Sequence, residues 1–348
     1  MQYTTALNNS QAVSLGELVA APGDILVDIG KSGRVTPWHV HKTAAQAVST
    51  VLMLNHPAVG ARMHSCADRL TFRRDWQDPD DAGRGRLHLA HAYFCRVRLC
   101  PMCQWRRSLK MFGQVRAVVD RLAADRRAAG RNPYDYSLLT LTVRNCDAAD
   151  LSATLDQLQQ GWQRLIRRKA VLDAVQGYIR AVEITYNRQT GQYHPHIHAL
   201  LCVNHSYFTS RKYIPQRQWA ALWRDCAKLD YAPQVDIRRA QGDAKSIAEV
   251  TKYATKPSDY IIPSDIDQMA AVLDTLYCAC AKRRFAGWGG VMAVAHSALQ
   301  LDDVDDGDLI HTGYDDAGES AAGAALWSWN WYAGPRLYIA NEKGECHV

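Results

Sequence analysis

Hydrophobic residues in the middle of the chain recur with two different periods. Continuous apolar runs predict buried strands, and apolar positions at three- and four-residue spacing, such as Leu155, Leu158 and Trp162, predict amphipathic helices. The predicted elements, in chain order, are a strand at 137–143, a helix at 151–175, strands at 178–186 and 193–203, a helix at 215–228, a strand at 234–239 and a helix at 244–255. This β-α-β-β-α-β order predicts an α+β domain with a ferredoxin-like antiparallel sheet and helices on one face.

The segments that flank this region have their own patterns. Residues 104–129 are helical and strongly basic, and Gly130 and Pro133 end that helix. After Pro263 come a further helix, a glycine turn, an acidic segment and alternating tryptophans that predict a strand with one apolar face. We therefore divide the chain into four segments: 1–60 with no recognisable motif, 61–132 with clustered cysteines and the basic helix, 133–262 as the α+β core, and 263–348 as a C-terminal helix with an acidic, tryptophan-rich extension.

Composition excludes several classes of protein. Of the 348 residues, 47% are hydrophobic and 22% are charged, which is ordinary for a globular protein and excludes a collagen, a coiled coil or a disordered chain. No apolar run reaches the roughly 18 residues that a membrane helix needs. The N-terminus also lacks the basic and apolar pattern of a secretory signal. We therefore expect a cytoplasmic protein with no membrane partner.

Charge is distributed unevenly along the chain. Residues 285–348 carry ten acidic and two basic residues, whereas residues 1–284 carry 39 basic against 25 acidic ones, a net charge of +14. A net charge of this size over residues 1–284 is typical of a protein that binds a polyanion. A solvated basic surface is the alternative explanation. The charge split also suggests the hypothesis that the acidic tail restrains the basic surface.

Three histidines at alternate positions are the sharpest local feature. In a strand, His194, His196 and His198 share one face while Ile197 points to the other, and imidazoles at that spacing can chelate a divalent ion. A two-residue loop places Glu183 of the preceding strand opposite His198, and a four-residue loop places it opposite His196. A loop with an odd number of residues turns the carboxylate away. Two imidazoles with this carboxylate suit Mn²⁺ or Mg²⁺ better than a closed zinc site.

The predicted helix at 244–255 carries a second set of reactive groups. Glu249, Tyr253 and Lys256 follow at i, i+4 and i+7, so they share one helical face. A free tyrosine has a pKa near 10, so only about one in a thousand is ionised at neutral pH. A nearby cation and a metal-polarised phosphate would make it a usable nucleophile, and Glu249 could direct a water molecule. The alternative is an ordinary glutamate–lysine pair on a helix surface.

Closely spaced cysteines predict a structural zinc site. Cys100 and Cys103 are separated by two residues and Cys95 lies five residues earlier, a spacing that suits tetrahedral zinc. The fourth ligand is open at this point, with His91 and His88 as candidates, and reduced, partly buried cysteines are the alternative explanation. A zinc loop that leads into the basic helix would present cationic side chains to phosphates.

Several motifs together resemble a known family. The strand Leu139-Thr-Leu-Thr-Val143, the pair His196-Ile-His198 and the sequence Tyr253-Ala-Thr-Lys256 follow the motif order of the HUH endonucleases. Over roughly residues 60 to 335 the chain resembles the rolling-circle replication initiators (Rep proteins) of small bacterial plasmids. The resemblance is carried by further segments at 94–108, 182–187, 194–201, 252–259 and 281–290.

The resemblance implies a mechanism. An initiator of this family recognises a double-stranded origin and cuts one strand at a single-stranded nick site, so the segment 133–262 would be an HUH endonuclease core. His196 and His198, with Glu183, would hold Mn²⁺ or Mg²⁺ on the scissile phosphate, and His194 would be a competing third ligand or a supporting group. Tyr253 would attack the phosphate and leave a 5′-phosphotyrosine and a 3′-OH primer.

The resemblance also assigns the remaining groups. Lys256 would orient the metal-bound complex or neutralise developing charge, and Glu249 would direct water in the terminating cleavage, with Tyr260 as a rival second tyrosine. Cys66, in the sequence Cys-Ala-Asp-Arg-Leu-Thr-Phe, is favoured as the fourth zinc ligand over His91. The residues expected to contact DNA are Arg106, Arg107, Lys110 and Lys252.

The expected partners are origin DNA, a host helicase and a polymerase, and an oligomer is compatible with the sequence. Three other functions are weighed against the initiator. They are a zinc-containing DNA-binding regulator without cleavage, an HUH transposase or relaxase, and a metal phosphoesterase for small molecules, which would leave the positive charge of residues 1–284 unexplained.

Overall fold

The structure of the protein is a computed structural model. It describes residues 23–30, 33–79, 85–240, 247–248, 250–251, 255, 257–313 and 326–340. The chain divides into two compact units. The small unit is drawn from residues 1–36, 69–90 and 317–348, and the large unit from residues 37–68 and 91–316. Each unit therefore joins segments that are far apart in the sequence.

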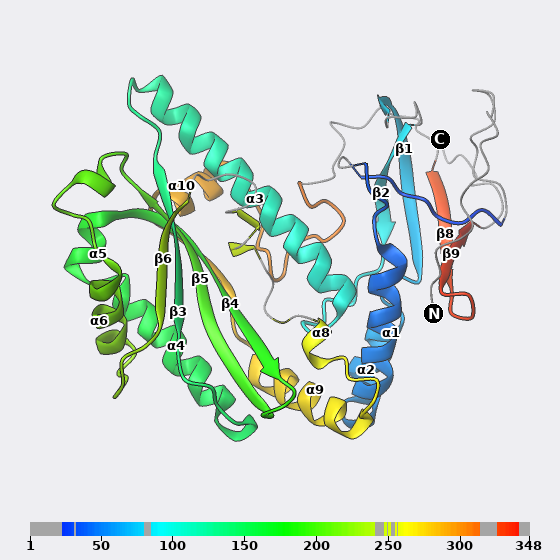
Figure 1. Ribbon diagram of the computed structural model, residues 1–348. Coiled ribbons are helices and arrows are strands. Elements are labelled where there is room, and N and C mark those ends of the chain that lie inside the picture. The colour runs from blue at the N-terminus through cyan, green and yellow to red at the C-terminus, as the bar shows by residue number, and fades with distance from the viewer. Residues whose placement is uncertain are drawn as a thin grey trace. The chain divides into compact units, whose positions relative to one another are not determined.

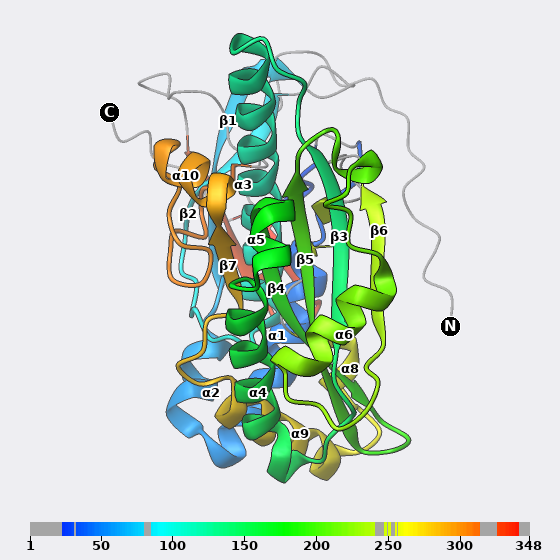
Figure 2. The same cartoon turned by 90° about the vertical axis from the view of Figure 1, so that its left-hand side faces the viewer.

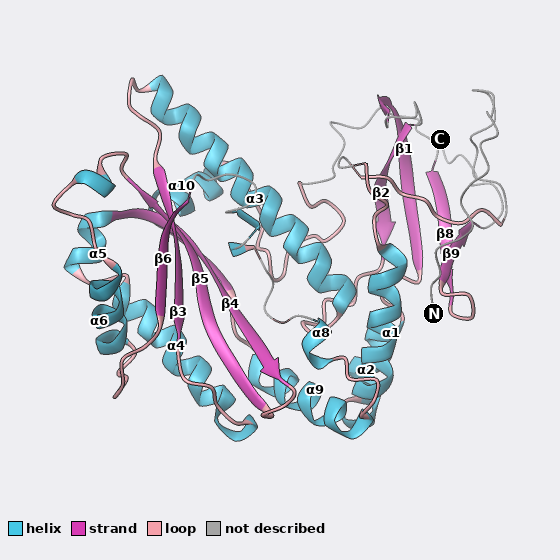
Figure 3. Ribbon diagram, viewed as in Figure 1, coloured by secondary structure: helices cyan, strands magenta, loops and turns pink. Residues whose placement is uncertain are grey.

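The small unit is built on a four-stranded sheet, coloured magenta with the other strands in Figure 3. Its strands, in the order in which they neighbour one another, are β2 (Gly85–Ala92), β1 (Arg69–Pro79), β8 (Leu326–Tyr332) and β9 (Leu337–Ala340). The alternating tryptophans lie in β8, which pairs antiparallel with β1 and β9. Trp329 is buried and its ring meets Phe72 edge-on at 5.7 Å between centroids. The predicted tryptophan strand with one apolar side is therefore confirmed.

The large unit contains a five-stranded antiparallel sheet (Figure 1). Its strands, in spatial order, are β6 (Val235–Ala240), β3 (Asp135–Thr142), β5 (Gln192–Val203), β4 (Val175–Asn187) and β7 (Ala286–Gly289). The first four are the strands predicted from the apolar runs, so the prediction of an α+β protein with an antiparallel sheet is confirmed. The fifth strand, β7, replaces part of the expected glycine turn.

Glycines allow β7 to lie against β4. Gly289 is paired with Tyr178, and a Cβ at Gly289 would lie 2.2 Å from the tyrosine ring. Gly290 has a φ of +58° and sits so close to Gln176 that a Cβ would lie 2.1 Å from its carbonyl oxygen. A side chain at either position would therefore push this edge strand away.

Three helices cover one face of this sheet, as Figure 2 shows: α4 (Leu151–Leu165), α5 (Lys169–Ala174) and α6 (Gln216–Cys226). Trp162 of α4 and Trp219 of α6 are almost completely buried. Together with Leu139 and Leu201 they line a small apolar cavity of about 170 Å³ on this face. The odd-numbered residues of β5 therefore point into this half of the core, as the strand period requires.

The opposite face is covered as well, which corrects the expectation of helices on one face only. The long helix α3 (Pro101–Ala128) and the short helix α10 (Gly290–Ala298) pack there. Met111 and Val115 of α3 belong to one buried cluster with Leu138 of β3 and Leu200 of β5. The basic residues of α3 dominate its sequence, but an apolar stripe at four-residue spacing decides where it packs.

Further helices complete the large unit: α1 (Trp38–Asn55), α2 (Pro57–His64), α8 (Pro257–Tyr260) and α9 (Ile266–Cys280). Helix α1 contacts α2, α3 and α9, although its sequence shows only a weak pattern. Its buried Lys42 explains part of that weakness, since the ammonium donates to the carbonyl oxygens of His64 and Cys66, both at 2.7 Å, and pairs with Asp68. Among the helices of the described residues, none is both long and apolar enough to cross a membrane.

Candidate functional site

The turn between β4 and β5 brings a carboxylate and two imidazoles together. Residues 188–191 form a four-residue turn that pairs Asn187 with Gln192, and this register places Glu183 opposite His196. An even loop was the condition for a shared face, and the structure satisfies it. The Nε2 atoms of His196 and His198 lie 3.0 Å apart, and the Oε2 atom of Glu183 lies 3.3 and 3.1 Å from them, respectively.

The other ring nitrogen of each histidine faces an acceptor. The Nδ1 atom of His198 lies 3.1 Å from the hydroxyl of Thr140, and the Nδ1 atom of His196 lies 3.1 Å from the carbonyl oxygen of His194. A proton on each Nδ1 leaves both Nε2 lone pairs directed at the same point as the Glu183 carboxylate. Two imidazoles and one carboxylate with their donor atoms within 4.8 Å of one another could hold a divalent cation.

His194 occupies a different position from the other two histidines. Its ring stacks on His196 with the centroids 5.2 Å apart, but its Nδ1 atom makes a 2.8 Å hydrogen bond with the side-chain oxygen of Asn145. Burial and the neighbouring His196 lower its pKa. The donor atoms close enough to share one cation at this position belong to Glu183, His196 and His198, and His194 is not among them. His194 therefore lies beside the candidate ligands as a neighbour.

Thr140 is the site residue that sequence analysis overlooked. It is paired with His198 across β3 and β5, which places both side chains on the same face. The signal was present, because Thr140 and Thr142 are the polar positions that alternate with buried leucines in this strand. Without knowing that β3 is the neighbour of β5, nothing in the sequence connects that hydroxyl to a histidine.

Four buried cysteines form a second cluster. Cys66 follows α2, Cys95 and Cys100 lie in the loop before α3, and Cys103 is in the first turn of α3. The Sγ atom of Cys103 lies 3.6 Å from that of Cys66 and 3.7 Å from that of Cys95, far beyond the roughly 2.05 Å of a disulfide. All four sulfurs fit within 4.8 Å, and His91 and His88 are outside the group.

The chemistry of this cluster suits a closed tetrahedral zinc site. Four thiolates around one point are a common structural zinc set. Burial raises the pKa of Cys100. Although burial also acts on Cys103, hydrogen bonds from the other three thiols and the Arg107 charge hold its pKa well below the ordinary value.

The predicted nucleophile helix falls largely outside the described residues. Tyr253, Glu249, Lys252 and Lys256 are not among them, so their positions stay predictions. Their described neighbours are well packed: Ile247 and Val250 are buried in the core between the sheet and α3. Thr255 forms a parallel bridge with Ile184, the residue after Glu183.

Tyr260, the rival tyrosine, cannot act as a nucleophile from its position. It is fully buried, and its hydroxyl donates to the carbonyl oxygen of Leu99 at 3.0 Å. Burial raises the pKa of Tyr260 well above its ordinary value, so the phenolate is strongly disfavoured. This excludes a second catalytic tyrosine at that residue in the conformation described.

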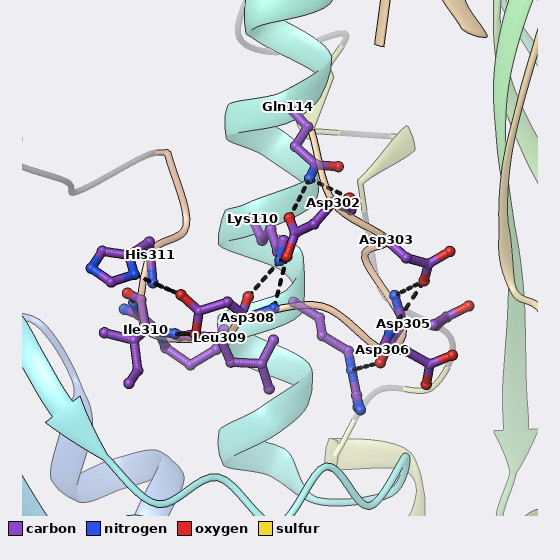
Figure 4. Close-up of polar contacts among 12 residues, drawn as sticks. Lys110, Gln114, Asp302, Asp303, Asp305, Asp306, Asp308, Leu309, Ile310 and His311 are labelled. Carbon is purple, nitrogen blue, oxygen red and sulfur yellow. Dashed lines mark hydrogen bonds and ion pairs between the residues drawn. The ribbon is translucent and has the colours of Figure 1, made fainter. Parts of the chain in front are cut away.

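The cations of α3 bind their own chain, which corrects the expectation that they contact DNA. Arg106, Arg107 and Lys110 are between 0% and 3% exposed. Residues 301–312, which we call the strap, cross this part of the helix (Figure 4). Arg106 donates to the carbonyl oxygens of Leu309 and Ile310 at 2.9 and 2.7 Å.

Lys110 is enclosed by the strap as well. Figure 4 shows its ammonium between the Asp302 carboxylate, with which it forms an ion pair, and the carbonyl oxygen of Asp308 at 2.5 Å. Arg107 donates to the carbonyl oxygens of Asp305 and Arg96. Buried cations with such partners stabilise the fold and are unavailable to phosphates.

Comparison with known proteins gives a consistent result. The profile of a family described as "Replication protein" matches residues 86–339. The chain is 36% identical over 328 residues to a "Protein rep" of Streptococcus pneumoniae serotype 2, covering 92% of this chain and 97% of that protein. It is 34% identical over 342 residues to a "Protein rep" of Bacillus amyloliquefaciens, covering 90% and 97%. No solved structure matches the chain.

The buried lysine gives a prediction about stability. Lys110→Met should lower the free energy of unfolding by about 2 kcal/mol, because the Asp308 carbonyl and the Asp302 carboxylate lose their donor. The Asp302 side chain is 48% exposed, so the ion-pair share of this loss is small. Urea unfolding measures the change.

Arg116→Met is the matched control on the same helix. The Arg116 side chain is 63% exposed and pairs with Asp120 at 3.7 Å, so its loss should cost no more than about 0.5 kcal/mol. Equal destabilisation by the two substitutions would contradict a structural role for Lys110.

Proposed function

The chain belongs to the replication protein family, whose members initiate plasmid replication, and we propose that it starts rolling-circle replication by nicking one strand of its origin. The convergence of Glu183, His196 and His198 on one point of the sheet carries this proposal. The strand order β6-β3-β5-β4 supports the ferredoxin-like form of an HUH endonuclease core around that point.

A divalent cation, Mn²⁺ or Mg²⁺, fits the group of Glu183 Oε2, His196 Nε2 and His198 Nε2. When bound, it supplies Lewis-acid polarisation of a phosphate oxygen. The protein's own contribution is to keep both imidazoles in the tautomer that leaves Nε2 free, through Thr140 and the carbonyl oxygen of His194. The almost complete burial of Glu183 keeps its carboxylate fixed against the two rings.

Tyr253 is the proposed nucleophile. Its phenol oxygen forms a bond to the scissile phosphorus as the bond from phosphorus to the 3′ oxygen breaks, and the 3′ oxygen leaves with a proton as a 3′-OH. The products are a 5′-phosphotyrosine and a primer end for leading-strand synthesis. The bridge between Thr255 and Ile184 supports this role, because Thr255 follows Tyr253 by two residues and Ile184 follows Glu183.

The neighbouring residues take supporting roles in the same proposal. Lys256 neutralises charge that develops on the phosphate, and Glu249 directs a water molecule in the terminating cleavage. Lys252 contacts DNA. The expected partners are the double-stranded origin, the single-stranded nick site, a host helicase and a polymerase. An HUH transposase or relaxase would share this chemistry and differ in its DNA substrate.

The four cysteines are proposed to hold a structural Zn²⁺. Their complete burial, their number and their separation fit a site with no open position, which is the form that stabilises a fold without joining a reaction. The zinc assignment can be tested separately from the nicking chemistry, because the cluster shares no ligand with the histidine group.

The nucleophile gives the most direct prediction. Wild-type protein, incubated with Mn²⁺ and single-stranded oligonucleotides that tile the DNA flanking its gene, should form a nucleotide adduct on Tyr253, detectable by denaturing gels and peptide mass spectrometry. Tyr253→Phe should retain binding but reduce cleavage to the uncatalysed background, since it lacks the attacking oxygen. Tyr213→Phe, at a tyrosine that is 45% exposed, is the control and should cleave normally.

Two other outcomes would redirect the assignment. Cleavage without an adduct would indicate hydrolysis by water and make Glu249 the residue to replace. Tight binding without cleavage at any metal concentration would favour the DNA-binding regulator.

The metal centre gives a prediction about affinity. Thr140→Val removes the acceptor for the Nδ1 proton of His198 and should weaken Mn²⁺ binding about 10- to 100-fold. Isothermal titration calorimetry of the full chain measures this change. Thr142→Val is the control, because the Thr142 hydroxyl donates to the carbonyl oxygen of Gln234 instead, and an equal loss in both variants would contradict the role of Thr140.

The cysteine cluster gives a prediction about metal content. The purified chain should contain about one zinc ion per molecule by elemental mass spectrometry, and Cys66→Ser should remove it, because four thiolates complete the tetrahedron. Cys278→Ser, at an exposed cysteine, should keep it. Full zinc content in Cys66→Ser would show that this cysteine is not the fourth ligand.

A further inference from the structure

Gln104, the residue after Cys103, makes a hydrogen bond to Thr255, which follows the proposed nucleophile Tyr253 by two residues in the sequence. Gln104 lies in the first turn of α3, directly after Cys103, and is 3% exposed. Its Nε2 atom donates to the carbonyl oxygen of Arg98 at 2.9 Å and to the hydroxyl of Thr255 at 2.7 Å. One buried amide therefore holds both the cysteine loop and Thr255, which is itself 2% exposed.

A second buried contact joins the same two segments. Tyr260 in α8 donates its hydroxyl proton to the carbonyl oxygen of Leu99, the residue before Cys100, at 3.0 Å. Neither Tyr260 nor Leu99 is exposed. A backbone acceptor and a phenol donor that are both removed from water keep their hydrogen bond, because each group would otherwise be buried without a partner.

The other side of this segment is attached to β4. Thr255 forms a bridge with Ile184, which lies beside Glu183 in β4. Arg188, the first residue after β4, donates to the carbonyl oxygens of Ser258 and Ile261. Thr255 and the residues of α8 are therefore held between the cysteine loop on one side and the strand that carries Glu183 on the other.

We propose that Gln104, Thr255 and Tyr260 are positioning residues for the nicking reaction. They couple the cysteine cluster to Thr255, which follows Tyr253 by two residues. In this way they set the position of Tyr253 relative to Glu183. The inference rests on the proposed function, because it takes Tyr253 as the nucleophile. Displacement of a reacting group by about 1 Å can cost a hundredfold in rate, so a small slip of Thr255 along β4 would be felt in the chemical step. On this view the cysteine cluster serves the reaction by bracing the nucleophile segment, and contact with DNA is not its task.

The test separates positioning from stability by its choice of substitutions. Thr255→Val keeps the shape of the side chain but removes the acceptor for Gln104, whereas Thr255→Ser keeps the hydroxyl. Tyr260→Phe removes only the hydroxyl that donates to Leu99. Tyr207→Phe is the matched control, because Tyr207 is also buried and its hydroxyl bonds a backbone group, the N–H of Ile214, in a different part of the unit.

The measurement is the single-turnover cleavage rate of the single-stranded origin oligonucleotide at saturating Mn²⁺ and DNA. Melting temperature and affinity for the oligonucleotide are recorded in parallel. Thr255→Val and Tyr260→Phe should each slow cleavage at least about tenfold, with unchanged affinity for DNA and an unchanged Mn²⁺ midpoint. Thr255→Ser and Tyr207→Phe should cleave within about threefold of wild type.

The possible results distinguish failure of the positioning inference from failure of the proposed nicking function. Normal cleavage by Thr255→Val and Tyr260→Phe would overturn the inference and leave the proposed function intact. Rates that fall only in proportion to the melting temperature, with Tyr207→Phe as slow as Tyr260→Phe, would also overturn it and assign these contacts to stability alone. Wild-type protein that forms no tyrosine adduct would overturn the proposed function and this inference with it.

Discussion

The antiparallel register between β4 and β5 is the constraint on which the candidate site depends. The four-residue turn pairs Glu183 with His196, so the carboxylate and the imidazoles leave the sheet on one side. Val182 and Ile197, the pair beside them, are completely buried on the other side. A slip of one residue would drive the charged group into the apolar core and place the aliphatic pair on the side of the donor atoms. The burial that stabilises the sheet therefore also assembles the donor atoms.

Some of the basic side chains of this protein are paired with groups of the same chain. An excess of basic residues such as that in the first 284 positions is typical of proteins that bind a polyanion. Three of the cations on α3, however, bind the strap at 301–312 and neighbouring carbonyl groups. Removing such side chains from water is costly unless they are paired, and the Asp302 carboxylate and backbone carbonyl groups of the strap provide those partners. A count of charges along a sequence therefore overstates the charge that a surface offers to DNA.

The cysteine cluster and the histidine group are separate in their ligands but connected in the structure. Cys103 lies in the first turn of α3 and Gln104 follows it. Gln104 donates to Thr255, and Leu99 accepts from Tyr260. Thr255 in turn forms a bridge with Ile184 of the strand that carries Glu183. Buried polar groups in a protein core are usually hydrogen-bonded, and here two of these hydrogen bonds connect the cysteine loop to the segment that contacts β4.

The sequence by itself determined the four central strands, the α4 and α6 helices between them, the shared face of the histidines and the grouping of the cysteines. Those features depend on the period of hydrophobic residues and on the short spacing between histidines or cysteines, which are local properties of a chain. Only the tertiary structure decided the length of the turn that sets Glu183 opposite His196, the contact between Thr140 and His198, the burial of Tyr260 and the ion pair and hydrogen bonds of Lys110 with the strap. The physical reason is the same in each case: partners that lie up to about 200 residues apart are brought together by packing, and no local pattern records which distant group will supply the hydrogen bond that a buried side chain requires.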